Sequence, residues 1–175
     1  MSLLTIAYPK LNDEDFLWIQ NYREKNDELY FNLVAPHFTI VFPVFDFSSD
    51  AFVEEIEAMS KGINQIYFEI KCATINKDSF IPYYHEFLVP DKGFSDIVKL
   101  HDKLYSEKLF SNLRMEIDFI PHIGIGNSKE VHVSKKRVDD LNKTGICISG
   151  QITHLDIVFY ENNKIEIIKR ISLST

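Results

Sequence analysis

Cysteine is scarce in this chain, and its scarcity excludes a disulfide-stabilised fold. Only Cys72 and Cys147 occur among the 175 residues, whereas small secreted domains held by disulfides carry many more. Both cysteines lie in apolar stretches that resemble strands. We therefore expect reduced, buried thiols in a cytoplasmic protein.

Long apolar runs are also missing. None approaches the ~20 residues that a membrane-spanning helix requires. The apolar stretch at residues 1–8 is short and lacks both the basic start and the cleavage site of a secretion signal. These two absences predict no membrane association.

Positive charge is in deficit. The formal net charge is −7 and the pI is about 5.3, which argues against extended nucleic-acid binding, since that depends on clustered Lys and Arg. A small phosphoester or an RNA terminus remains compatible with this charge. We also expect no metal, because most of the histidines show no ligand spacing with Cys, Asp or Glu: His85, His101, His132 and His154.

The composition is otherwise that of a globular protein. Hydrophobic residues make up 45% of the chain, with 14 Phe and 8 Tyr, which favours a β-containing fold over disorder. A chain of this length suits a single domain over residues 1–175 with a core that needs neither disulfide nor metal. We expect it to be a monomer.

Periodicity predicts alternating strands and helices. Pro43 is expected to end one strand, and residues 145–150 are expected to form a turn. Strands are predicted at 3–8, 37–42, 66–72, 86–89, 117–125, 152–160 and 165–171, the last two forming a hairpin, and helices at about 13–25, 51–61, 94–107 and 133–142. The pattern by itself indicates a mixed α/β protein without specifying its topology.

Two of these strands carry the same short motif, in which a histidine follows a proline. Pro36-His37-Phe38-Thr39-Ile40-Val41-Phe42 is echoed by Pro121-His122-Ile123-Gly124-Ile125. Since side chains alternate along a strand, His37, Thr39 and Val41 should share one face, opposite the apolar Phe38, Ile40 and Phe42. The second copy places His122, Gly124 and Gly126 together in the same way. A histidine with a small residue two positions on, used twice, predicts a phosphate cradle.

The two segments resemble the signature pair of the two-histidine (2H) phosphoesterase superfamily, which includes 2′-5′ RNA ligase-like proteins and cyclic phosphodiesterases. Members carry two His-x-Thr/Ser-x motifs. His37-Phe38-Thr39-Ile40 matches fully, whereas His122-Ile123-Gly124-Ile125 has glycine in place of the hydroxyl residue. The resemblance extends upstream through 7–11 and 18–23. It implies a duplicated, two-lobed α+β fold in which antiparallel sheets face a central cleft and helices lie outside.

The resemblance also implies roles for the motif residues. His37 and His122 become the general acid and base that act on a 2′,3′-cyclic phosphate or a 2′-5′ linkage, since imidazole serves either role at neutral pH. Thr39 becomes a hydrogen-bond donor to a phosphate oxygen. No cofactor is implied, and the sequence does not indicate which histidine is the base.

Gly124 opens an alternative interpretation, in which the second motif has decayed and the protein binds a phosphorylated ligand without turning it over. A glycine there permits close backbone approach, and Asn127 or Ser128 at the strand end could supply the missing donor. A further alternative is an RNA-binding protein without chemistry that stacks bases on Tyr83 and Tyr84, although the negative charge opposes it.

Two further residues are candidates for substrate binding. Arg23 shares a helical stripe with Phe16 and Ile19, so its head either points toward the site or lies in water above a packed stem. Tyr83 either walls the cleft and stacks a nucleobase or is purely structural.

Overall fold

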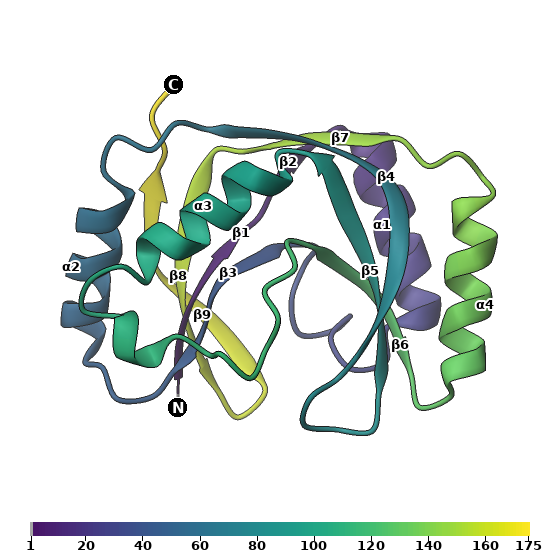
Figure 1. Ribbon diagram of the computed structural model, residues 1–175, viewed down its shortest axis with the longest axis horizontal. Coiled ribbons are helices and arrows are strands. Elements are labelled where there is room, and N and C mark those ends of the chain that lie inside the picture. The colour runs from purple at the N-terminus through teal and green to yellow at the C-terminus, as the bar shows by residue number, and fades with distance from the viewer. Residues whose placement is uncertain (1) are drawn as a thin grey trace.

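Two antiparallel sheets form the frame of the molecule (Figure 1). The computed structural model describes residues 2–175; Met1, the start of the apolar N-terminal stretch, lies outside the described residues. The sheet of lobe A has the strand order β3 (Phe38–Val44), β1 (Ser2–Ala7), β8 (His154–Glu161), β9 (Lys164–Ser172), and the sheet of lobe B the order β2 (Lys10–Leu11), β7 (Ile148–Ile152), β4 (Ile66–Lys77), β5 (Tyr84–Lys92), β6 (Ile123–Ser128).

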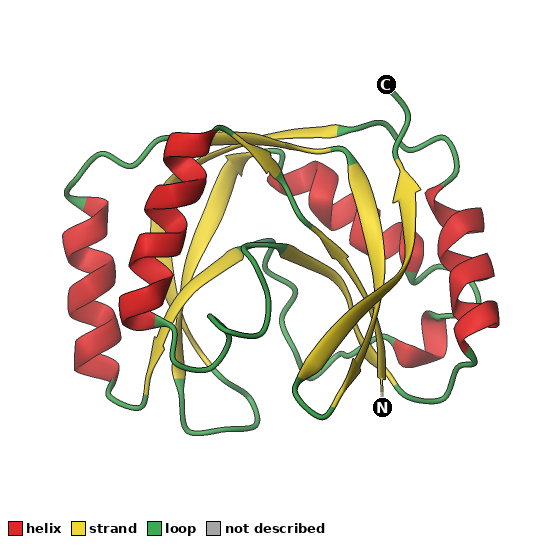
Figure 2. Cartoon of the chain, turned by 180° about the vertical axis from the view of Figure 1, so that it is seen from behind, coloured by secondary structure: helices red, strands yellow, loops and turns green. Residues whose placement is uncertain are grey.

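Helices cover the outer sides of both lobes (Figures 1 and 2). In lobe B, α1 (Asp13–Asn26) packs on β6, and α4 (Val131–Asn142) packs on β4, β5 and β6. In lobe A, α2 (Ser49–Ser60) packs against α3 (Phe94–Leu104), which contacts β3; a short 3-10 helix, Phe110–Asn112, follows α3. The arrangement confirms the expected two-lobed α+β fold.

Local sequence explains where two helices begin. The side chain of Asn12 accepts a hydrogen bond from the backbone N–H of Asp15 at 2.8 Å, and Ser48 caps α2 through Ala51 in the same way. Such caps satisfy backbone donors that have no partner within the helix. The helix predicted to begin at about residue 13 does begin at Asp13, directly after the capping Asn12.

Each lobe combines segments from distant parts of the chain. In lobe A, β1 lies between β3 and β8, so the N-terminal strand pairs with the C-terminal hairpin β8–β9. Asn162 and Asn163 join that hairpin with φ angles of 50° and 57°, as a two-residue type I′ turn requires. The predicted hairpin is confirmed.

The two motif strands both lie at a sheet edge. β3 is the edge strand of lobe A, and β6 is the edge strand of lobe B. Pro43 lies inside β3 and does not end it, because an edge strand tolerates a residue without an N–H donor. β6 begins only at Ile123, not at residue 117 as predicted, and follows Pro121, which has no N–H to donate.

The predicted turn at 145–150 was wrong at its end, because β7 already begins at Ile148. Gly150 pairs with Phe68 of β4 and Leu11 of β2. A Cβ at this position would lie 2.5 Å from the Phe68 ring. Glycine therefore marks close packing inside a strand here, although sequence alone suggested a turn.

The main core fills the space between sheets and helices, and includes Phe38, Ile40, Phe68 and Leu88, each fully buried. Cys72 is partly buried, but Cys147 is exposed, so the expectation of two buried thiols was wrong for Cys147. Across residues 2–175, no helix has the length and apolar character that crossing a membrane demands.

Candidate active site

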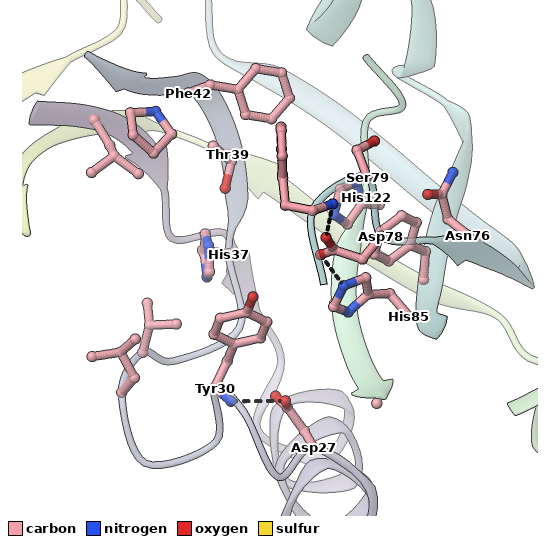
Figure 3. A pocket seen from close by; sticks show the side chains of 18 of the residues that line it. Asp27, Tyr30, His37, Thr39, Phe42, Asn76, Asp78, Ser79, His85 and His122 are labelled. Atoms are coloured by element: carbon pink, nitrogen blue, oxygen red, sulfur yellow. Dashed lines mark hydrogen bonds and ion pairs between the residues drawn. The ribbon is translucent and has the colours of Figure 1, made fainter. Parts of the chain in front are cut away.

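A cavity of about 450 Å³ lies between the two lobes, and both motifs line it. His37 and Thr39 come from the lobe A side, and His122 comes from lobe B (Figure 3). Gly124, in β6 of lobe B, also lines the cavity. The fold therefore brings the four motif positions, far apart in the sequence, to one cavity.

The cavity has an apolar wall and a polar wall. Leu4, Leu33, Val34 and Ile165 form the apolar wall. The polar side comes from the end of β4 and the loop that follows it, which contribute Asn76, Lys77, Asp78 and Ser79. Such a cavity suits a ligand with a charged end and an apolar or aromatic body.

Backbone carbonyls orient the two histidines identically. Nδ1 of His37 lies 2.8 Å from the carbonyl oxygen of Ala35, and Nδ1 of His122 lies 2.5 Å from that of Ile120. Because a carbonyl only accepts, each Nδ1 must carry the proton and donate it. Each Nε2 is then unprotonated in the neutral ring, and no group among residues 2–175 bonds to it.

Burial lowers the pKa of both His37 and His122 to about 4. The bonded carbonyls act in the opposite direction without compensating, and proximity to His37 lowers the pKa of His122 further. Both rings are therefore neutral at neutral pH, and each Nε2 is available as a base.

A β-bulge changes which residues of the first motif face the cavity. Thr5 of β1 pairs with Val41, but the next residue, Ile6, pairs with Thr39. Between these two pairs β3 advances by two residues while β1 advances by one, so β3 contains one extra residue. Beyond this bulge, the side chains of β3 that would have faced the cavity face the core, and the reverse. Val41 is fully buried and Phe42 lines the cavity, so their predicted faces were wrong, whereas those of His37 and Thr39 were right.

The two glycines of the second motif have different environments. A Cβ at Gly124 would meet no atom within 4 Å, whereas a Cβ at Gly126 would lie 2.5 Å from Oε2 of Glu86. Any side chain at 126 would therefore force the buried Glu86 carboxylate to shift, whereas a side chain at 124 would displace nothing. A threonine or serine side chain could therefore be accommodated at 124 without a steric clash at its Cβ.

The residues proposed to replace the missing hydroxyl do not reach the cavity. Asn127 donates from Nδ2 to Oδ1 of Asp27 at 2.6 Å, and Oγ of Ser128 accepts from the backbone N–H of Glu130. Neither Asn127 nor Ser128 lines the cavity. That expectation was wrong.

Arg23 lies at the edge of the cavity but is 1% exposed. Its guanidinium pairs with Asp27 at 2.9 Å and donates to the backbone carbonyls of Tyr30 and Val34. A further bond runs to Gln20. The interpretation with the head in water was therefore wrong, and the donors are largely committed to the protein itself.

Tyr83 does not line the cavity. Its hydroxyl donates to Oε1 of Glu28 at 2.5 Å, and the ammonium of Lys129 lies 5.4 Å from its ring centre. The structure therefore separates Tyr83 from the two histidines.

The sequence prediction missed three side chains that line the cavity: His85, Phe87 and Tyr30. Nε2 of His85 lies 2.7 Å from Oδ2 of Asp78, and Phe87 stacks on His122 with centroids 3.5 Å apart. Tyr30 lies near His85, at 6.1 Å between ring centres (Figure 3). A signal was present, since His85 and Phe87 alternate along a strand and share one face.

The Asp78–His85 pair does not amount to a metal site. Within residues 2–175, no three His, Cys, Asp or Glu side chains gather in a way that could hold a metal ion. Asp78 also accepts from the backbone N–H groups of Phe80 and Ile81. The carboxylate thus organises its own loop and orients His85.

Comparison with known proteins places the chain in a family. The sequence model of the 2′-5′ RNA ligase superfamily matches residues 9–164, whereas no protein of curated function matches significantly. Similar solved structures, each covering 99% of this chain and 98% of theirs, are apo LigT of E. coli (17% identity, TM-score 0.59), TT0787 of Thermus thermophilus (9%, 0.62) and Usb1 of Kluyveromyces marxianus (8%, 0.56). These structures share the fold, and the family match confirms the resemblance of the motifs: the chain belongs to the 2′-5′ RNA ligase superfamily.

Proposed function

We propose that this protein is a metal-independent phosphoesterase that hydrolyses a 2′,3′-cyclic phosphate or acts on a 2′-5′ linkage at an RNA end or in a small nucleotide. One observation carries the proposal. Two imidazoles, each with Nδ1 held by a carbonyl and Nε2 free, line a single cavity between the lobes.

In this mechanism the two histidines divide the proton transfers. Nε2 of one ring takes a proton from water as the water oxygen attacks phosphorus. The other ring, protonated, donates its proton to the ribose oxygen as the bond between phosphorus and that oxygen breaks. His37 and His122 fit these roles because both present a free Nε2.

Binding of the substrate favours the protonated form of one ring, which takes its proton from solvent. The low pKa of about 4 of both histidines leaves neither charged at neutral pH. A phosphodiester anion beside an imidazole favours the charged form and raises its pKa. Thr39, two residues from His37 on the same face, donates to a nonbridging oxygen, where charge must be held in the transition state.

Cavity size and a relative's ligands support a nucleotide-sized substrate. The cavity of about 450 Å³ falls in the range of sites for small ligands. E. coli LigT, 15% identical to this chain in those structures, was solved with 3′-AMP and with phosphate. We propose that this cavity accepts the same chemistry, a single phosphate attached to a nucleoside.

The test is hydrolysis of a panel of 2′,3′-cyclic phosphates, as mononucleotides and at RNA ends, in EDTA. The proposal expects turnover that EDTA leaves unchanged and a product with a single phosphomonoester, whose isomer identifies the bond broken. Absence of turnover across the whole panel, together with intact binding of inorganic phosphate, would contradict it.

That second outcome corresponds to the other candidate function, a phosphate-ligand binding module without chemistry. The observation that favours it is Gly124, which gives the second motif no hydroxyl donor. Losing one such donor costs roughly 10²–10³-fold in rate in well-studied enzymes. The two functions thus differ in rate and not in where the ligand binds.

Gly124→Thr is expected to raise kcat for a 2′,3′-cyclic phosphate by about tenfold, because the new hydroxyl would match Thr39 of the first motif. The site has room, since a Cβ there meets nothing within 4 Å and the φ of Gly124 is not in the left-handed region. Gly124→Val is the matched control, with the same shape and no hydroxyl. Equal rates in the Thr and Val variants would show that the missing hydroxyl is not what limits the reaction.

A further inference from the structure

One hydroxyl in the cavity has no partner in the protein. Tyr30 lines the cavity and is 40% exposed, and no group among residues 2–175 hydrogen-bonds to its hydroxyl. Figure 3 shows the hydroxyl directed away from Asp27 and into the space between His37 and His85. The tyrosine therefore presents a donor where a ligand held between the histidines would lie.

The backbone of Tyr30 is held in place from several sides. Its N–H donates to Oδ1 of Asp27 at 3.0 Å, and its carbonyl accepts from Nη2 of Arg23 at 3.1 Å. Asp27 is bonded in turn to Asn127 at the end of β6. The ring thus projects from a fixed turn, so that its hydroxyl needs little reorganisation to meet a ligand.

The hydroxyl is a donor over the whole neutral range. Burial raises the pKa of Tyr30, and the carboxylates of Asp78 and Asp27 raise it further. A protonated phenol donates one hydrogen bond, and an anionic phosphate oxygen is its natural acceptor.

We propose that Tyr30 supplies the phosphate-oxygen donor that the second motif lacks at Gly124. The inference rests on the proposed function, since the phosphate lies in the same site. Thr39 would bind one nonbridging oxygen and Tyr30 the other, from the turn that precedes the first motif and lies far in sequence from the second. The reaction would then retain two hydroxyl donors despite the incomplete second motif.

Tyr30→Phe tests this, because it removes only the hydroxyl. We expect kcat for 2′,3′-cyclic AMP to fall by roughly 10-fold to 10²-fold. Adding Gly124→Thr to Tyr30→Phe should recover most of that loss, and should raise the rate by a larger factor than it does in the wild type. Such a dependence between the two positions is expected only if they serve the same oxygen-binding role.

Tyr83→Phe is the matched control. Tyr83 lies outside the cavity, and its hydroxyl donates to Oε1 of Glu28 at 2.5 Å. Loss of that hydroxyl should change kcat less than twofold. If Tyr30→Phe has no more effect than Tyr83→Phe in a folded protein, the proposal is overturned.

Binding of inorganic phosphate separates this inference from the proposed function. Should the wild type fail to hydrolyse any cyclic phosphate, the enzyme proposal fails, whereas the Tyr30 donor is still judged by phosphate affinity. Phosphate should then bind about tenfold more weakly to Tyr30→Phe, as expected for a hydrogen bond to a charged group. An unchanged dissociation constant, measured through the imidazole resonances, would overturn the donor role.

Discussion

His37→Ala and His122→Ala are each expected to lower kcat/KM for a 2′,3′-cyclic phosphate by roughly 10²–10⁴-fold, the usual contribution of a general acid or base. Each ring presents a free Nε2 to the cavity. Removal of either leaves one proton transfer without a partner. Steady-state kinetics in EDTA measures the effect, and circular dichroism checks the fold.

The double variant carries additional information. If His37 and His122 act as one unit, removing both should cost little more than removing one, because effects of residues that act as a unit are not additive. Losses that multiply would instead indicate that the two rings act in separate steps or on separate ligands.

Two other histidines serve as controls. His132 is exposed on α4 and does not line the cavity, so His132→Ala should leave kcat/KM within twofold. His85 lines the cavity but is paired with Asp78, so His85→Ala should have an effect well below that of His122→Ala. A larger loss from His85→Ala than from His122→Ala would refute the assignment of the catalytic pair.

The part of the site that follows from residue spacing within a strand could be predicted from the sequence. His37 and Thr39 share a face because they are two residues apart on a strand, and His122 and Gly124 repeat the spacing. The resemblance to a known family then added what the pattern could not, namely that the two sheets carrying the motifs face one cleft. The alternation of strands and helices alone left the topology open.

The sequence pattern gave wrong predictions where contacts between distant segments determine the local structure. The bulge in β3 exposes Phe42 to the cavity and buries Val41, and it is defined by pairing with β1, a strand from a different part of the chain. Gly150 suggested a turn, but it serves close packing against Phe68. Neither arrangement has a signal within its own segment.

Tyr30 and Arg23 illustrate a second limit. Both depend on the turn between α1 and β3, a segment that lies between the helix predicted at 13–25 and the strand predicted at 37–42. The structure shows instead that Asp27 and Arg23 organise this turn through buried hydrogen bonds. Burial of an ion pair cannot be deduced from the helical periodicity of Arg23, because that periodicity is equally compatible with a surface position.

The buried pair leads to the second large effect that we expect. Arg23→Met should lower the free energy of unfolding by about 3–5 kcal/mol, because removing one partner of a buried ion pair leaves the other charge uncompensated. Asp27 is only 5% exposed. The carbonyls of Tyr30 and Val34 would lose their donor as well. Urea denaturation measures the change.

Lys136→Met is the matched control, since Lys136 and Asp140 form an ion pair with the same i, i+4 spacing on an exposed helix face. An exposed pair contributes about 0–1 kcal/mol. A cost for Arg23→Met no greater than that of Lys136→Met would contradict a structural role for the buried pair.

Arg23→Lys separates structure from phosphate binding. Lysine keeps the positive charge, but its single ammonium cannot reproduce the planar fork that reaches Asp27, Tyr30 and Val34 together. We therefore expect Arg23→Lys to lose most of the stability that Arg23→Met loses. If Lys instead restores stability and phosphate affinity together, charge near the cavity matters more than the hydrogen bonds.

The hydrogen bonds of Arg23 hold the turn that precedes His37, and Asp27 connects this turn to Asn127 of β6, the strand that follows His122. We therefore also expect Arg23→Lys to position both histidines less well and to lower kcat.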